Sequence, residues 1–128
     1  MSAFQKVKDY LIQLEYNILE EDLPEELFIV EKEESGINRL IVDCEDPILI
    51  IEYPLFKPVT DKPEMYKQLL EKNRDIIHGA FAITDEGTVI FRDTLQLDNL
   101  DLNELEGSLE SLELLLAEYA GQLIEFSK

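Results

Sequence analysis

The sequence predicts an α+β fold, in which helices flank an antiparallel five-stranded sheet in the order α-β-β-β-α-β-β-α. Two patterns lead to this class. Near both ends and near the middle of the chain, apolar residues recur at spacings of three and four, which is typical of one face of a helix. Between these stretches apolar and polar residues alternate, which is typical of strands. A doubly wound parallel sheet would need a helix between successive strands, whereas three strand-like segments here follow one another directly.

The composition indicates one folded, acidic domain over residues 1–128. The chain carries 11 lysines and arginines against 29 aspartates and glutamates, a formal charge of −18, and 45% of its residues are hydrophobic. A chain of this length buries roughly two thirds of its unfolded surface, so it needs no disulfide or metal to fold. Its single cysteine, Cys44, excludes an internal disulfide.

The first helix is predicted over residues 3–20. Ser2 and Gln5 stand at the spacing of a capping box, and Pro24 blocks continuation of the helix. The apolar stripe that would face the core consists of Phe4, Val7, Leu11, Leu14 and Ile18.

Three strand-like segments follow, at residues 27–32, 37–44 and 48–53. Ser35-Gly36 offers the positive φ of a tight turn between the first two, and Glu45-Asp46-Pro47 reverses the chain again. We therefore expect an antiparallel three-stranded meander.

A second helix is predicted over residues 62–73, where Asp61 and Glu64 have the spacing of another capping box. After it, residues 79–84 and 88–95 alternate well and flank an Asp-Glu-Gly turn, which predicts a hairpin.

The last helix begins after Asp101, which forms a third capping box with Glu104. A lone leucine stripe in a mixed domain favours packing on the chain's own sheet over an intermolecular coiled coil. The stripe comprises Leu102, Leu105, Leu109, Leu112, Leu116, Tyr119, Leu123 and Phe126.

Alternation sorts the residues of the meander onto two faces. The first is apolar throughout and is expected to form the core under the helices: Phe28, Val30, Leu40, Val42, Cys44, Leu49, Ile51 and Tyr53. The second interleaves isoleucines with charges: Leu27, Ile29, Glu31, Arg39, Ile41, Asp43, Ile48, Ile50 and Glu52. One of the chain's own helices, a second copy or a partner peptide could cover it. If it is open, the candidate client-binding residues are Ile29, Ile41, Ile48 and Ile50.

The charge limits the partners that the chain can attract. An acidic surface repels nucleic acid and anionic membranes, and no apolar stretch approaches the roughly 20 residues that cross a bilayer. The same charge attracts basic peptides or proteins and raises their rate of encounter. We therefore expect a cytoplasmic protein with a protein partner.

The sequence lacks the common motifs of enzymes. It contains no G-x-S-x-G, no phosphate-binding loop and no dinucleotide fingerprint, and Cys44 and His78 alone cannot form a zinc site. His78 lies near Asp75, but a histidine just after a helix is more often a cap or a loop residue than an acid–base catalyst. We therefore expect no catalytic residue, no metal and no cofactor.

The segments Lys67 to Asn73 and Ala80 to Arg92 resemble the class I type III secretion chaperones, of the Tir-chaperone type, and the related YbjN-like bacterial domains. In these families a leucine-bearing helix that ends in Asn precedes a hairpin with an Asp-x-Gly turn and a long terminal helix. The resemblance implies an acidic cytoplasmic homodimer that holds a non-globular client segment without ATP. It also implies a dimer contact at Met65, Tyr66, Leu69, Leu70 and Phe81.

The sequence thus supports two hypotheses. The first is a non-enzymatic, acidic, chaperone-like module that, as a homodimer, holds an extended and basic-flanked client segment. The second is a YbjN-like regulatory or structural dimerisation module that binds a folded partner, because Phe91-Arg92 followed by Asp93-Thr94-Leu95 is closer to the YbjN-like branch.

Overall fold

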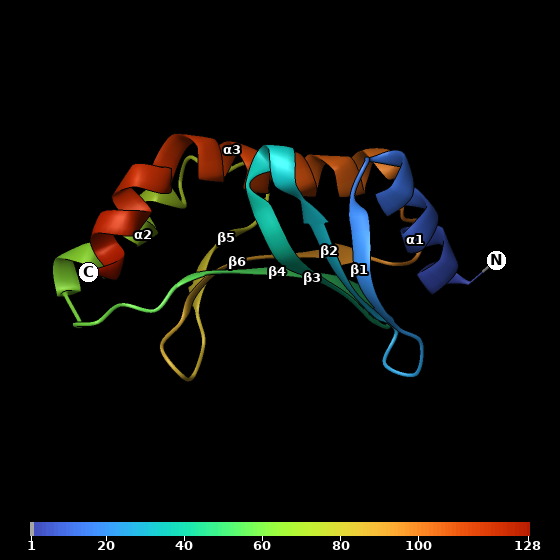
Figure 1. Cartoon of the computed structure of the whole chain (residues 1–128), viewed down its shortest axis with the longest axis horizontal. Coiled ribbons are helices and arrows are strands. Elements are labelled where there is room, and N and C mark those ends of the chain that lie inside the picture. The colour runs from blue at the N-terminus through green and yellow to red at the C-terminus, as the bar shows by residue number, and fades with distance from the viewer. Residues whose placement is uncertain (1) are drawn as a thin grey trace.

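The computed structural model describes residues 2–128 and confirms the α+β class (Figure 1). Its strands form one antiparallel sheet in the order β1-β2-β3-β4-β6-β5, with six strands where five were predicted. The elements are α1 (Ala3–Gln13), β1 (Asn17–Asp22), β2 (Leu27–Lys32), the 3-10 turn η1 (Glu33–Ser35), β3 (Ile37–Glu45), β4 (Ile48–Phe56), α2 (Pro63–Lys72), β5 (Ala80–Ile83), β6 (Val89–Gln96) and α3 (Leu102–Ser127).

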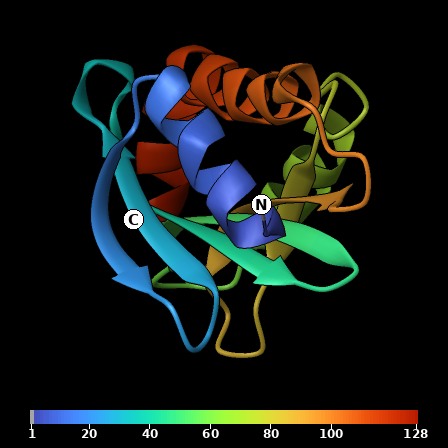
Figure 2. The same cartoon turned by 90° about the vertical axis from the view of Figure 1, so that its right-hand side faces the viewer.

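Two of the helices cover one face of the sheet. α3 runs along this face, the sheet bends around α1 (Figure 2), and α2 lies beside the C-terminal part of α3 (Figure 1). The core is one cluster of side chains from α1, α2, α3 and the inner face of the sheet. The predicted inner face is confirmed, because each of these residues is at most 8% exposed: Phe28, Val30, Leu40, Val42, Cys44, Leu49, Ile51 and Tyr53.

The predicted helix over residues 3–20 is wrong beyond Gln13. Leu14 ends α1, Glu15 turns the chain with a φ of +67°, and the following residues form the additional strand β1. Acid-rich segments have weak strand propensity, but pairing with β2 overrides it here. Ile18 fits the helical stripe and a strand equally well, and it pairs with Val30 of β2.

The helix boundaries follow the predicted signals in two of three cases. Ser2 Oγ accepts a hydrogen bond from Gln5 N at 3.1 Å, and Asp101 and Glu104 form a complete capping box. The predicted box at Asp61 does not form. Its carboxylate instead accepts a hydrogen bond from Tyr66 Oη at 2.7 Å.

The longest helix, α3, has two different faces. Its predicted apolar stripe is buried or half-buried against the sheet and α2, whereas Leu114 on the opposite face is 62% exposed. Among residues 2–128, no helix combines the length and the apolar character that a membrane span requires.

Candidate protein-binding surfaces

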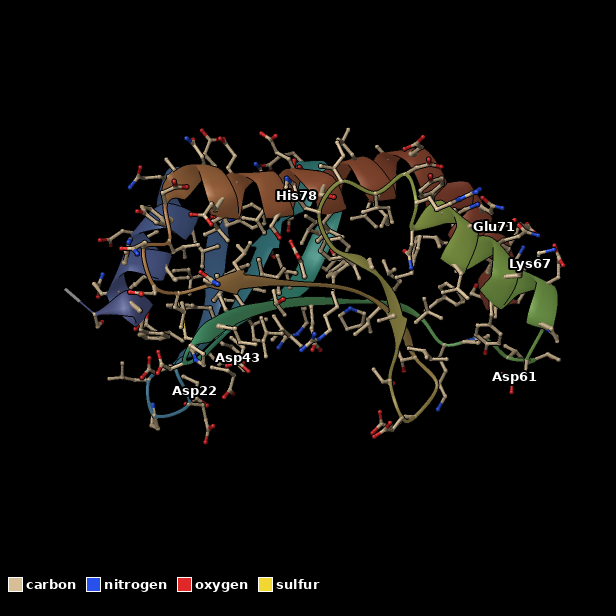
Figure 3. The ribbon with its side chains drawn as sticks, turned by 180° about the vertical axis from the view of Figure 1, so that it is seen from behind. Asp22, Asp43, Asp61, Lys67, Glu71 and His78 are labelled. Carbon is tan, nitrogen blue, oxygen red and sulfur yellow. The ribbon has the colours of Figure 1, made fainter. Side chains whose placement is uncertain are left out.

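The sheet face that carries the interleaved isoleucines, here called the outer face, points away from α1 and α3. Figure 3 shows Asp43, one of its residues, on the side of the sheet opposite these helices. Within residues 2–128, no helix packs on this face. A helix of the chain itself was one candidate to cover this face. Within the described residues, the structure excludes that candidate.

The sheet register brings the isoleucines of the outer face together. Ile29 and Ile41 pair directly across β2 and β3, and all four predicted client-binding residues are half-buried. Ile50 pairs with Asp43, two residues along from Ile41, so it lies diagonally next to Ile41 at roughly 7–8 Å. Ile48 is one step further along β4. The result is a continuous apolar strip across three strands. Whether a client binds there stays a prediction.

The charges around this strip leave it acidic. Arg39 Nη2 lies 2.9 Å from Glu20 Oε1, and Arg92 Nε lies 3.1 Å from Glu52 Oε1, so both arginines are already neutralised by glutamates. Asp43 forms no ion pair with any residue that the structure describes. An incoming basic side chain would therefore meet uncompensated negative charge.

Asp43 lies between Leu27 and Ile50 in neighbouring strands, and its Oδ1 is buried without a hydrogen-bond partner in the described chain. Burial of the carboxyl, followed by the negative charge of Glu45 and by smaller effects of Glu25 and Glu52, together raise its pKa from 3.8 to about 6. Near neutral pH the Asp43 carboxyl is charged, and keeping this charge in a half-buried site lowers the stability of the folded protein.

Replacing Asp43 with asparagine should therefore stabilise the protein at pH 7.5 by roughly 1 kcal/mol, a value reduced for partial solvent screening. Because the pKa is higher in the folded than in the unfolded chain, the Asp43 contribution falls as pH rises from about 4 to about 6. The difference between variant and wild type in urea denaturation should thus be small at pH 4 and full above pH 6. A constant difference across this range would contradict the assignment.

The predicted dimer-contact residues divide into buried and exposed ones. Met65, Leu69 and Phe81 are at most 6% exposed and belong to the core of the chain. Leu70 is 68% exposed and Tyr66 is half-buried. The exposed part of the predicted contact therefore consists of Tyr66 and Leu70.

Four of these five residues line an apolar groove between α2 and the β5–β6 hairpin, which we call the α2 groove. Its volume is about 530 Å³. The lining includes Tyr66, Leu69, Leu70 and Phe81, and also Ile83, which is 54% exposed. Whether a second copy occupies this groove stays a prediction.

Asn73 closes the free edge of the sheet beside the α2 groove. Its Oδ1 accepts a hydrogen bond from Phe81 N at 2.8 Å, and its Nδ2 donates one to Phe81 O at 3.3 Å. The side-chain amide thus takes the place of a neighbouring strand at β5, which protects this edge from strand addition.

His78 and Asp75 lie in the connection between α2 and β5. Figure 3 shows His78 beside α3, and its backbone is held there by Ser111, whose Oγ donates to His78 O at 2.6 Å and accepts from His78 N at 3.3 Å. These contacts give His78 a structural place in joining the connection to α3.

Sequence reasoning missed two residues of these surfaces, Asn73 as an edge cap and Ile83 as a groove residue. The alternation in the hairpin assigned Ile83 to a strand but gave no sign that it would be exposed. Only the packing of α2 against the hairpin brings these residues together.

Comparisons with known proteins give one family and a consistent fold. The family model CesT_Tir_1 matches the chain over residues 1–128. Among curated proteins, no sequence matches this chain significantly.

Three of the similar solved structures illustrate the fold. A chain of the heterodimeric ExoU–SpcU complex from the type III secretion system of Pseudomonas aeruginosa aligns with a TM-score of 0.67 at 15% identity, covering 94% of this chain and 96% of that chain. A chain of the complex between the Yersinia pestis type III secretion chaperone SycH and a stable fragment of YscM2 gives 0.62 at 13% identity, covering 98% and 100%. YbjN from E. coli gives 0.58 at 10% identity, covering 93% and 92%. At these identities the likeness shows the fold alone.

Proposed function

Because this chain belongs to the CesT_Tir_1 family, we propose that it is a non-enzymatic chaperone that binds an extended segment of another protein on the outer face of its sheet. We further propose that it acts as a homodimer in the cytoplasm. The family match bears out the resemblance to type III secretion chaperones that the sequence suggested.

The open outer face is the observation that carries this proposal. It offers a continuous apolar strip of four isoleucines within an acidic surround, and no part of the described chain covers it. An extended segment with alternating apolar side chains fits a surface of this period, because side chains on one face of a strand repeat every two residues. Basic residues of the client would pair with Asp43 and its neighbours.

Two of the similar structures are described as complexes of type III secretion proteins, ExoU with SpcU and SycH with a fragment of YscM2. These descriptions favour a protein client for this chain as well. The half-buried isoleucines would each add about 1 kcal/mol when fully covered, which suits reversible holding of a client.

The α2 groove supports the homodimer. In this groove the exposed side chains of Leu70 and Ile83 lie beside other apolar side chains. The groove is next to the edge of β5 that Asn73 closes. A contact through side chains in this groove is therefore favoured over the pairing of two β5 strands.

The client site is tested by replacing Ile41 with lysine. Ile41 pairs with Glu52, so the new lysine gains an acidic neighbour and should leave the fold intact. Polypeptides retained by the wild type from the source cell are identified by mass, and the retained segment is synthesised. We expect Ile41→Lys to bind this segment at least about tenfold more weakly by fluorescence anisotropy.

Asn38→Lys is the matched control, because Asn38 is exposed, lies in the same strand and is not one of the outer-face residues. It adds the same charge and should keep the affinity of the wild type. Equal affinities of the two variants, or no polypeptide retained by the wild type, would overturn the proposal.

The likeness to YbjN favours one alternative, a regulatory or structural dimerisation module that binds a folded partner. This alternative predicts that the wild type retains a folded protein and that peptides from its sequence do not bind. The same pull-down therefore separates the two functions.

A further inference from the structure

A third apolar surface lies on the outward side of α3, and neither the proposed client site nor the proposed dimer contact uses it. η1 and α3 enclose a groove of about 760 Å³, here called the α3 groove. Leu114, Ala117 and Ala120 line its floor, and Leu114 is 62% exposed. Ile124, 59% exposed, continues the same line one turn further along the helix. The groove lies where the connection between β2 and β3 meets α3, and none of the outer-face residues lines it.

The side chains on the floor of the groove are spaced in a way that suits packing against a second helix. Large side chains at Leu114 and Ile124 bracket the small residues Ala117 and Ala120, so a bulky side chain of a partner can enter between them. The ten-residue separation of the two large residues corresponds to roughly 15 Å along the helix, or nearly three turns.

The rim of the α3 groove is acidic and in part uncompensated. Glu113 accepts hydrogen bonds from Tyr16 Oη at 2.9 Å and from Ser35 Oγ at 3.0 Å and lies 3.7 Å from Lys32 Nζ, so its charge is already balanced. Glu34 and Glu110 form no ion pair with residues 2–128. Basic side chains flanking an apolar stripe would complement this rim.

A helix face offers no free backbone donors or acceptors, so a segment that docks on it must satisfy its own backbone hydrogen bonds. A helix does this, whereas an extended segment would leave these groups unpaired. A second copy of this chain that used the same groove would bring its own Glu34 and Glu110 against these acids.

We infer that the α3 groove binds an amphipathic helix of a protein partner, with its apolar stripe on Leu114, Ala117 and Ala120 and with basic side chains opposite Glu34 and Glu110. This surface is distinct from the outer face, so it allows a second protein to bind while a client is held.

The probe is a labelled peptide of about 18 residues in which leucines recur at spacings of three and four and the other positions are lysine or alanine. Binding to the full-length protein is measured by fluorescence anisotropy at 0.15 M salt. We expect Leu114→Asp and Glu110→Lys each to weaken binding at least about tenfold. Two control peptides are tested on the wild type, one with glutamate in place of lysine and one with the leucines scrambled. Their affinity for the wild type should be no higher than the affinity of the two variants for the probe.

Leu23→Asp is the matched control, because Leu23 is 64% exposed and also lies among acidic residues, between β1 and β2. It should bind the probe like the wild type, and so should Ile41→Lys, which separates this surface from the proposed client site. Equal loss in Leu23→Asp and Leu114→Asp, or equal binding of the scrambled peptide, would indicate unspecific attraction and overturn the inference. A wild type that does not bind the probe, or a dimer that Leu114→Asp dissociates, would also overturn it.

Discussion

Replacing Gly79 with alanine should lower the free energy of unfolding by about 3 kcal/mol or more. Gly79 has a φ of +79°, and a Cβ atom there would lie 2.6 Å from Phe91 Cζ and 3.0 Å from the carbonyl oxygen of Arg92. The Phe91 ring is fully buried and cannot move aside without disturbing the core. Urea denaturation monitored by circular dichroism measures the change.

Gly87→Ala is the control that separates backbone strain from the clash. Gly87 has a similar φ of +88°, but a Cβ there would meet no atom within 4 Å. We expect this variant to lose only about 1 kcal/mol, the cost of the left-handed backbone. If both variants lost the same amount, the close packing of Gly79 on Phe91 would not be the cause.

The position of Gly79 also explains why its loss would matter beyond stability. It precedes β5, whose Phe81 is held by the Asn73 side chain and lines the α2 groove. A shift of the backbone at Gly79 would therefore disturb the edge of the sheet and the predicted dimer contact together.

The meander and its two faces were predictable from the sequence because a strand that is buried on one side repeats its pattern every two residues. The alternation at residues 27–53 placed Phe28 and Val30 in the core and Ile29 on the opposite side, as the structure shows. That no helix covers the outer face was not predictable, because it depends on where α1 and α3 pack.

β1 could not be predicted because its own residues favour neither element strongly. Residues 17–22 contain four acidic or amide side chains and become a strand only by pairing with β2. Lys8 Nζ, 2.9 Å from Glu21 Oε1, adds a contact between α1 and this strand. These contacts join residues of different elements, so the spacing of apolar residues within one segment gives no sign of them.

The exposure of the proposed dimer-contact residues was only partly predictable. The resemblance to a family supplied Tyr66 and Leu70, which are accessible, together with residues such as Met65 that pack inside the chain. Helical periodicity distinguishes the two faces of α2, but the groove arises from the approach of the β5–β6 hairpin. Ile83 and Asn73 acquire their places only through this tertiary contact.

Replacing Leu70 with aspartate should convert the proposed homodimer to a monomer. Leu70 is 68% exposed in the single chain, so the fold should tolerate the change. In a two-fold symmetric contact through the α2 groove the substitution acts twice, and each buried leucine is worth about 1.5–3 kcal/mol. The dissociation constant should therefore rise at least about 100-fold, which light scattering coupled to gel filtration detects as a mass falling from twice 14.8 kDa toward 14.8 kDa.

Ile12→Asp provides the comparison, because Ile12 is 55% exposed on α1, outside the α2 groove. It introduces the same charge and should leave the dimer intact. Circular dichroism of both variants checks that the fold is retained. A wild type that is monomeric at 100 μM would contradict the homodimer itself, whereas a dimer that resists Leu70→Asp but dissociates with Ile12→Asp would place the contact on α1. Because the proposed client site lies on the outer face and not in the α2 groove, a monomeric Leu70→Asp variant should still bind the client segment, which makes dimerisation and client binding separable.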